Sequence, residues 1–360
     1  MAKTRTLKAG IIGVGGISGV HNSGYVKSSM AEVYALCDIV PETLKKKSEM
    51  YNVPRERCFA DWRDLLKLDE VDCVSICTPN KLHCEMTLAA LKARKHVLCE
   101  KPMATTPAEC KRMNAAAAKA GRKLQIGLMH RFRSDANYIK KLLDEGVLGN
   151  VYFARCQAIR RRGVPSWGVF GQLDKQGGGG LIDIGVHLID LTWWLMGKPI
   201  PVAVSGATYR TIGNTPGHKG QFGPWDWKTY TVEDFASGLV RFKNGATMSI
   251  ECGFIANLDK AREGLHVVGD KGGAGTNPLS VQLEVAGHIV DCTPNDISTV
   301  DLHGRPDAAT SNHEKEVYSF CDAILNNKPV YVPGTEVINV QKIINGLYES
   351  AARGKEVAIK

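Results

Sequence analysis

The stretch Leu7-Lys-Ala-Gly-Ile-Ile12, followed at once by Gly13-Val-Gly15-Gly16-Ile-Ser18, decides the fold of this chain. A short apolar run, a glycine-rich turn and then residues 19–30, which can continue as a helix, form the strand, turn and helix of a dinucleotide-binding fingerprint. Gly13 permits a tight turn, Gly15 lets backbone amides approach a pyrophosphate, and Ser18 is small enough for close helix packing. The pattern alone is weak evidence, because an ordinary glycine-rich turn has the same composition.

An acidic residue at the right distance strengthens this interpretation. Residues 32–38 read as a second strand, and Asp38 lies twenty residues after Ser18, where a carboxylate accepts hydrogen bonds from both ribose hydroxyls. Because a carboxylate there repels a 2′-phosphate, NAD is favoured over NADP. The alternative is that Asp38 caps a helix beginning near Pro41. We expect the cofactor to contact Asp38 and the turn residues Gly13, Gly15, Gly16, Ile17 and Ser18.

Strands and helices continue to alternate as far as residue 127. Repeated alternation of this kind predicts an α/β fold with a parallel, doubly wound sheet. Further strands are expected at residues 72–78, 96–99 and 123–127, and helices at residues 41–51, 62–68, 81–93 and 107–120.

Two strands of this predicted sheet end in polar residues. Thr78-Pro79-Asn80 closes one strand, and Glu100-Lys101-Pro102 closes the next. In open parallel sheets ligands bind beyond the carboxyl ends of the strands, so both segments are expected at the cofactor edge. Pro102 biases Lys101 away from the helical conformation and so fixes the direction of its side chain. Taken alone, Glu100 and Lys101 would read as a surface charge pair.

A third segment carries titratable groups after the glycine run of residues 177–180. Residues 181–196 are predicted to form a helix with Asp183 and His187 one above the other on one face, and Asp190 one turn further along. This arrangement suits proton transfer. It also fits a buried histidine bonded to backbone, a carboxylate favoured at a helix start or, with further ligands, a zinc site. For Asp190 we favour a structural role.

The length of the chain favours two domains. A chain of 360 residues with 44% apolar residues exceeds what one hydrophobic core usually supports. We place the domains at residues 1–129 and 130–360. Lys and Arg exceed Asp and Glu by 46 to 37, but the longest basic run is Arg160-Arg161-Arg162. Since no basic-aromatic motif accompanies that run, we expect no nucleic-acid partner.

The cysteines and the apolar segments indicate the cellular compartment to expect. Eleven cysteines show neither paired C-x-x-C knuckles nor the density of a disulfide scaffold, so we expect reduced thiols and no metal site. No window offers 18 uncharged apolar residues, and we expect no membrane association. The N-terminus resembles a signal peptide only superficially, because its apolar stretch holds five glycines and no convincing cleavage site follows. A cytoplasmic protein is expected.

Together these motifs give the chain a resemblance to the glucose-fructose oxidoreductase/inositol dehydrogenase (Gfo/Idh/MocA) family. Their order, spacing and co-occurrence make the match specific, and it spans nearly the whole chain. The segments that carry it are Gly13–Ser18, Cys77–His83, Glu100–Pro102, Gly178–His187 and the tail Tyr348–Val357.

The resemblance implies the architecture of both domains. The family pairs a Rossmann NAD-binding domain with an α/β domain that binds substrate and forms oligomers. That second domain is built on a large, mostly antiparallel open sheet. Its strands are expected here at residues 150–160, 202–209, 231–242 and 246–253.

The resemblance also implies roles for individual residues. Lys101 orients and polarises the reacting hydroxyl, His187 is the general base, and Asp183 holds the substrate or His187 in register. An imidazole titrates near working pH and can both accept and return a proton, while a lysine stabilises developing alkoxide charge. The implied cofactor contacts beyond the glycine turn are Thr78, Pro79, Asn80, His83, Glu100 and Lys101. The implied substrate contacts are Lys101, Met129, Arg131, Trp167, Asp183 and His187.

The substrate is expected between the domains, near residues 160–171 and 210–230, which are rich in aromatic side chains. Aromatic faces with polar edges suit the C–H faces of a pyranose or cyclitol, although such residues also pack loops or subunit contacts. We therefore expect oxidation of a ring hydroxyl of a sugar, glycoside or inositol to a ketone. A glycoside 3-dehydrogenase would make good use of the aromatic segment.

Two other functions stay open. One is an NAD-dependent glycosidase, which oxidises, eliminates, hydrates and reduces without net redox change. The other is a ligand sensor that binds NAD and catalyses nothing. In each case a homodimer or homotetramer is the family expectation, because a large sheet with one face free of helices usually needs a partner subunit.

Overall fold

The computed structural model describes residues 5–297 and 311–359. The chain divides into two compact units, Met1–Phe132 with His303–Ile338, and Arg133–Leu302 with Asn339–Lys360. The first unit ends close to the predicted boundary after residue 129. It also contains residues 311–338, which are predicted from the sequence to belong to the second domain.

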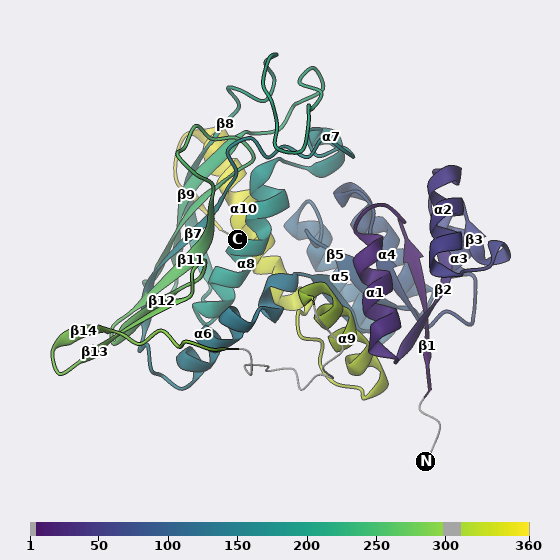
Figure 1. The fold of residues 1–360 in the computed structure, drawn as a ribbon, viewed down its shortest axis with the longest axis horizontal. Coiled ribbons are helices and arrows are strands. Elements are labelled where there is room, and N and C mark those ends of the chain that lie inside the picture. The colour runs from purple at the N-terminus through teal and green to yellow at the C-terminus, as the bar shows by residue number, and fades with distance from the viewer. Residues whose placement is uncertain (1–4, 298–310, 360) are drawn as a thin grey trace. The chain divides into compact units, whose positions relative to one another are not determined.

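The first unit is built on a parallel sheet of six strands in the order β3-β2-β1-β4-β5-β6 (Figure 1). The predicted parallel, doubly wound sheet is therefore confirmed. Strand order reverses between β1 and β4, which is where such sheets bind their ligands. The strands are β1 (Leu7–Ile12), β2 (Ala31–Cys37), β3 (Cys58–Phe59), β4 (Cys73–Ile76), β5 (His96–Glu100) and β6 (Leu124–Gly127).

Helices cover this sheet, and local sequence signals explain where several of them begin. α5 starts with a capping box between Thr106 and Glu109 and has proline in its first turn, an arrangement that satisfies backbone N–H groups otherwise left without partners. The helices are α1 (Ser18–Ser28), α2 (Pro41–Tyr51), α3 (Trp62–Leu66), α4 (His83–Lys92), α5 (Pro107–Ala120) and α9 (Asn312–Leu325).

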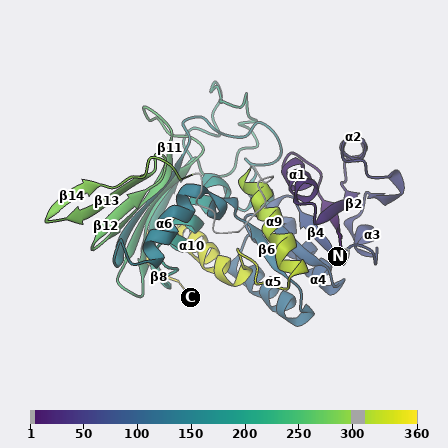
Figure 2. The same ribbon diagram turned by 60° about the horizontal axis from the view of Figure 1, so that its bottom comes forward.

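α9 returns from late in the sequence to pack beside α1 (Figure 2). A β-carbon at Gly24 of α1 would lie 2.6 Å from Cβ of Val317, so only glycine allows the two helices to approach so closely. Ser23 and Lys27 of α1 both donate to the carboxylate of Glu314. Val317 and Phe320 complete the core beneath β1 and β2. The first unit is therefore assembled from two distant parts of the chain.

The second unit contains a sheet of nine strands in the order β14-β13-β12-β11-β7-β10-β9-β8-β15. Its strands pair antiparallel except for β7 with β10, which confirms the expected large, mostly antiparallel sheet. The strands are β7 (Val151–Ile159), β8 (Pro201–Tyr209), β9 (Phe235–Phe242), β10 (Thr247–Gly253), β11 (Arg262–Gly269), β12 (Gly272–Gly275), β13 (Ser280–Val285), β14 (His288–Asp291) and β15 (Val357–Ala358).

Helices lie on one face of this sheet, and within the described part of the unit the opposite face carries none (Figure 1). α8 (Val186–Leu195) contacts β7 and β11, and α6 (Ser134–Asp144) contacts α8. α7 (Leu173–Gln176) is a single turn, and α10 (Gly334–Arg353) runs from the first unit into the second. None of the helices in the described residues is long and apolar enough to span a membrane.

Two predicted elements differ from those observed. β9 begins at Phe235 rather than Thr231, because residues 231–234 are held by loop contacts instead of a strand ladder. The helix predicted from residue 181 to residue 196 begins as a π-helix, η4 (Leu181–Gly185), and continues as α8. In a π-helix the hydrogen bonds run to the fifth residue, so Asp183 and His187 do not stack as in a regular α-helix.

Candidate active site

The glycine turn after β1 has the conformation and open space that a dinucleotide needs. Gly13 has φ +86°, and a β-carbon there would lie 2.7 Å from the carbonyl oxygen of Cys77. At Gly15 and Gly16, by contrast, an added β-carbon would meet nothing within 4 Å. The protein's own packing therefore does not demand glycine at these two positions, but backbone amides approaching a bound pyrophosphate would.

Ser18 secures this turn from within the helix that follows it. Its side chain is buried, its hydroxyl donates to the carbonyl oxygen of Gly15 at 2.7 Å, and it lies 3.1 Å from the hydroxyl of Tyr51. The serine therefore stabilises the turn by a hydrogen bond, and its small side chain also allows close helix packing. Its neighbour Ile17 is the residue before α1 and has no side-chain capping bond.

Asp38 lies at the end of β2, beside the glycine turn. Its Oδ2 accepts the N–H of Val14 at 2.8 Å, and its Oδ1 accepts the N–H of Val40 at 2.9 Å. Val40, not Asp38, is the residue that precedes the first turn of α2, so the helix-capping alternative does not describe this aspartate. Asp38 ties the turn to the second strand, the position from which the family fingerprint contacts ribose.

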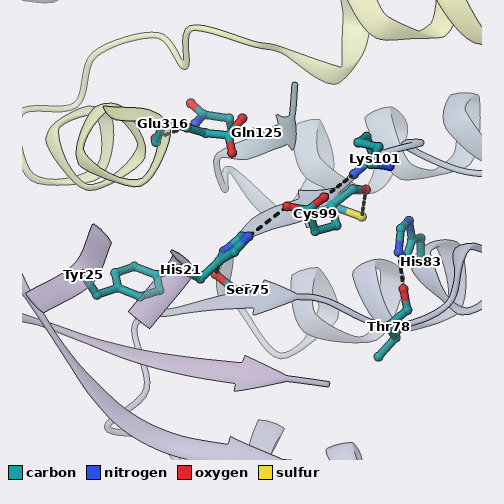
Figure 3. A network of polar contacts seen from close by, with 10 residues as sticks. His21, Tyr25, Ser75, Thr78, His83, Cys99, Lys101, Gln125 and Glu316 are labelled. Atoms are coloured by element: carbon teal, nitrogen blue, oxygen red, sulfur yellow. Dashed lines mark hydrogen bonds and ion pairs between the residues drawn. The ribbon is translucent and has the colours of Figure 1, made fainter. Parts of the chain in front are cut away.

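His83 joins the two loops that follow β4 and β5. Its ring is fully buried, with Nδ1 2.7 Å from the carbonyl oxygen of Pro102 and Nε2 2.9 Å from that of Thr78 (Figure 3). Burial lowers the pKa of His83, and the two carbonyl groups oppose that shift. Both nitrogens therefore face protein backbone. The ring thereby shapes the loops that carry Thr78, Pro79 and Lys101, and the cofactor contact implied for His83 stays a prediction.

The carboxylate of Glu100 is buried and joins a chain of polar groups formed by His21, Ser75 and Tyr25, which Figure 3 labels. Its Oε1 lies 2.9 Å from Nε2 of His21, and Nδ1 of His21 lies 2.9 Å from Oγ of Ser75. The hydroxyl of Tyr25 lies 2.8 Å from the same Oγ. Gly127 on the neighbouring strand leaves room for this carboxylate, since a β-carbon there would lie 3.0 Å from Oε1.

The direction of these hydrogen bonds follows from their chemistry. An ionised Glu100 only accepts, so Nε2 of His21 donates to it, and the hydroxyls of Ser75 and Tyr25 continue the chain from Nδ1. Burial raises the pKa of Glu100, but the hydrogen bond and charge of His21 outweigh burial and hold the pKa below its usual value. Glu100 is thus a buried carboxylate, and its Oε2 accepts the backbone N–H of Lys101 at 3.2 Å.

Lys101 lies beyond the end of β5, where its side chain is half-buried (Figure 3). Its backbone is fixed from two sides, by Glu100 through its own N–H and by His83 through the carbonyl of Pro102. This fixed backbone supports a directed ammonium group at the carboxyl edge of the sheet. His21 and Ser75, which complete the arrangement, were missed in the sequence; the only signal was a histidine three residues after Ser18.

Arg131 and Met129 lie in a short 3-10 helix, η3 (Met129–Phe132), after β6. The guanidinium of Arg131 is 0% exposed and donates to Glu336 at 2.8 Å. This buried ion pair joins η3 to the start of α10, and the substrate contact implied for Arg131 stays a prediction. Met129 is half-buried.

In the second unit, packing explains the whole glycine run before η4. Gly177 has φ +80° and ends α7. A β-carbon at Gly178 would collide with the hydroxyl of Tyr348, one at Gly179 would lie 2.5 Å from the carbonyl oxygen of Glu233, and one at Gly180 would lie 2.7 Å from Cα of Gly253. The run therefore lets η4 approach the sheet closely.

The helix that follows holds the predicted catalytic pair. Asp183 is buried within η4, and His187 is half-buried in the first turn of α8. Segments of π-helix within longer helices occur frequently at functional sites. Asp190 is completely buried, and its structural role stays a prediction.

The aromatic segments divide into an inner and an outer set. The inner Tyr230 is buried and donates to the carbonyl oxygen of Glu233, and Trp225 donates to that of Gly213. In the outer set, Trp167 is 56% exposed and its ring centroid lies 5.3 Å from that of Phe222 in an edge-on contact. The inner residues pack the loop, whereas the outer rings are available to a ligand.

The thiol groups of the chain lie mostly inside the protein. All eleven cysteines are free, and eight of them are buried. Within residues 5–297 and 311–359, no group of three or more His, Cys, Asp or Glu side chains is arranged to hold a metal ion.

Two family descriptions match the chain and cover most of it. Residues 7–128 match an oxidoreductase family with an NAD-binding Rossmann fold, and residues 140–359 match the C-terminal α/β domain of the same family. The predicted NAD-binding domain is thereby confirmed.

Similar proteins extend the match to full length. The chain is 34% identical over 356 residues to D-glucoside 3-dehydrogenase of Escherichia coli, covering 98% of this chain and 97% of that protein. The crystal structure of aldose-aldose oxidoreductase from Caulobacter crescentus matches with a TM-score of 0.80 and 26% identity, covering 98% of this chain and 100% of that one. A levoglucosan dehydrogenase complex with NADH and levoglucosan matches with a TM-score of 0.84 and 25% identity, covering 99% and 100%.

An NAD-binding Rossmann unit, a mostly antiparallel second sheet and matches to both family domains lead to one conclusion: the chain belongs to the Gfo/Idh/MocA family of NAD-dependent oxidoreductases.

Proposed function

We propose that this protein is an NAD-dependent dehydrogenase that oxidises a secondary ring hydroxyl of a sugar or glycoside to a ketone. The proposed reaction is oxidation of the 3-hydroxyl of a D-glucoside. The observation that carries the proposal is the full-length similarity to D-glucoside 3-dehydrogenase. The exposed rings of Trp167 and Phe222 support a glycoside over a small free polyol, because aromatic faces pack well against the C–H faces of a pyranose.

The chain's own residues supply the acid-base chemistry in this proposal. His187 takes the hydroxyl proton, Lys101 stabilises the negative charge that develops on that oxygen, and Asp183 keeps the substrate or His187 in register. When bound, nicotinamide would accept the hydride that leaves the carbon bearing this hydroxyl. Two electrons and one proton leave as hydride, and the second proton leaves through His187.

Cofactor binding falls to residues at the carboxyl edge of the first sheet. The amides of Gly15 and Gly16 approach the pyrophosphate, and Asp38 accepts from the ribose hydroxyls. The loops at Thr78–Asn80 and Glu100–Lys101 border the nicotinamide half. In this proposal Glu100 acts mainly through the position of Lys101, because its carboxylate is turned toward His21.

The experiment is a substrate panel assayed with NAD+ at 340 nm. Aryl D-glucosides, methyl glucoside, free hexoses and inositols are each incubated with the purified protein, and aglycone release is measured in parallel. NADH formation in proportion to 3-keto glycoside supports the dehydrogenase. Released aglycone without NADH identifies the oxidation-elimination glycosidase instead. Absence of both, with NAD binding intact, identifies a ligand sensor.

We further propose a homodimer or homotetramer that covers the helix-free face of the second sheet. Along β7 the side chains alternate, with Ala154 and Cys156 buried beneath α8, while Arg155 is exposed and Gln157 half-buried on the opposite face. Light scattering coupled to size-exclusion chromatography tests this assembly. A mass of 39.2 kDa, that of one chain, would contradict it.

A further inference from the structure

We propose that two adjacent buried carboxylates, Glu233 and Asp234, are positioning residues: Glu233 sets the helix that carries Asp183 and His187, and Asp234 sets the aromatic loop. The aromatic loop is defined here as residues 210–230, between β8 and β9. The inference rests on the proposed function for its kinetic consequences, but its structural part stands on contacts within the second unit alone.

Glu233 acts as the cap of η4 and α8. Its Oε2 accepts the N–H of Gly179 at 2.9 Å, and its Oε1 accepts the N–H of Leu181 at 3.0 Å. The first N–H groups of a helix have no partners within it, and a negative charge is favourable at that end. Gly180, the residue before η4, makes no side-chain capping bond. The carboxylate of Glu233 therefore provides what the local sequence does not.

Tyr348 fixes this carboxylate from the other side. Its hydroxyl donates to Oε1 of Glu233 at 2.9 Å. The same hydroxyl is the atom that a β-carbon at Gly178 would strike. Glycines at 178 and 179 are thus what allow the backbone to reach both Glu233 and Tyr348.

Asp234 makes the corresponding contacts to the aromatic loop. Its Oδ2 accepts the N–H groups of Thr211 and Ile212, each at 2.6 Å, and its Oδ1 accepts that of Gly213 at 2.9 Å. Three consecutive amides at the start of the loop therefore converge on one buried carboxylate. Gly213 in turn accepts from the indole N–H of Trp225 at 2.8 Å, which carries the anchorage into the aromatic part of the loop.

The two carboxylates are neighbours in sequence but serve different elements. Glu233 is 7% exposed and Asp234 2% exposed, and a buried carboxylate of this kind is costly unless it is hydrogen-bonded. Each is bonded to the backbone of one functional element. The two residues before β9 therefore connect the helix that carries Asp183 and His187 to the loop that would contact the glycoside.

The structural part is tested by hydrogen-deuterium exchange, without any substrate. Glu233→Gln places an amide NH2 against a backbone N–H and is expected to raise exchange in residues 177–190, leaving residues 210–230 unchanged. Asp234→Asn is expected to raise exchange in residues 210–230 alone. Glu263→Gln, an exposed glutamate on β11 of the same unit, is the matched control and changes neither segment. Equal effects of both variants on both segments would overturn the division of roles.

The kinetic part separates kcat from KM. Glu233→Gln is expected to lower kcat about tenfold with KM for an aryl glucoside nearly unchanged, and Asp234→Asn to raise that KM about tenfold with a smaller change in kcat. NAD affinity stays within about twofold in both, because the NAD-binding residues lie in the other unit. If both variants lowered kcat and raised KM to the same extent, the two residues would not have separate positioning roles.

Two milder variants cover the case in which the first pair does not fold. Tyr348→Phe removes one donor to Glu233, and Trp225→Phe removes the indole bond to Gly213; each should reproduce its partner's exchange pattern at smaller amplitude. If neither does, the proposal fails. If the exchange pattern holds but no glycoside is oxidised, the positioning roles stand and the proposed function fails.

Discussion

Nε2 of His21 lies 2.9 Å from Oε1 of Glu100, and both side chains are buried at the carboxyl edge of the first sheet. His21 stands on α1 directly behind the glycine turn, whereas Glu100 precedes Lys101 at the end of β5. The contact therefore joins the segment that would hold the pyrophosphate to the residue that would polarise the substrate. It also explains why a carboxylate survives in the interior: His21 supplies the donor that keeps it ionised.

His21→Ala should weaken both stability and catalysis. Removing the donor leaves a buried carboxylate with one bond fewer, which costs about 2–3 kcal/mol of unfolding free energy. Tyr25→Phe removes only the hydroxyl that contacts Ser75, and it should lower the unfolding free energy by about 1 kcal/mol. Thermal unfolding checks the order of these effects. A fully stable His21→Ala variant would show that Glu100 does not depend on the pair.

Gly16→Ala separates cofactor binding from folding. No protein atom lies within 4 Å of the added β-carbon, so the melting temperature should remain that of the parent protein. The methyl group would occupy space that the pyrophosphate needs, and NAD affinity should fall at least tenfold. Isothermal titration calorimetry provides the measurement. Unchanged affinity would place the pyrophosphate elsewhere.

Asp38→Ala should relax discrimination between the two dinucleotides. Loss of the carboxylate weakens NAD and removes the repulsion that excludes the 2′-phosphate of NADP. Asp38→Asn is the informative companion, since its amide oxygen can still accept from Val14 or Val40 while the charge is gone. The ratio of kcat/KM for NAD to that for NADP reports the effect, and an unchanged ratio in both variants would rule out this role for Asp38.

His96 should make stability depend on pH. Burial, reinforced by Arg122 and Lys123, lowers the pKa of His96 to about 4, and its Nδ1 accepts the N–H of Lys123 at 3.0 Å. Between its usual pKa of about 6.5 and that lowered value, the unfolded chain binds a proton that the folded chain refuses, so stability falls as pH falls.

His96→Gln keeps an acceptor for Lys123 but does not titrate. Between pH 7 and pH 5 the parent protein should lose about 1 kcal/mol more than this variant, after allowance for the partial exposure of the ring. Thermal unfolding at the two pH values supplies the comparison. An identical pH slope in parent and variant would show that His96 protonates freely in the fold.

The first sheet could be predicted because its signals are local. Five of its six strands were predicted from apolar runs that end near a glycine or polar residue, whereas the two-residue β3 was not predicted. Each helix that was predicted there starts at a recognisable boundary such as Pro41 or Pro107. The place of α9 in the first unit was not predicted, because it depends on contacts between distant parts of the chain. An amphipathic pattern indicates that one face of a helix is buried. It does not indicate that this face packs on α1, almost three hundred residues away.

The candidate site was predictable in its residue types but not in its supports. Asp183, His187 and Lys101 stand out by chemistry and spacing, whereas Glu233 and Asp234 look like any acidic pair before a strand. Their roles arise from backbone amides far away in the sequence. The buried ion pair of Arg131 and the π-helical start at Leu181 likewise depend on tertiary packing that periodicity does not encode.

The most direct test of the proposed function compares the parent protein with His187→Ala on an aryl D-glucoside and NAD+. The parent protein should form one NADH for each 3-keto glucoside, identified by mass spectrometry and NMR. His187→Ala should lose about a thousandfold or more in kcat, while binding NAD with parental affinity. Aglycone release without NADH, or full activity in His187→Ala, would contradict a dehydrogenase that uses His187 as its base.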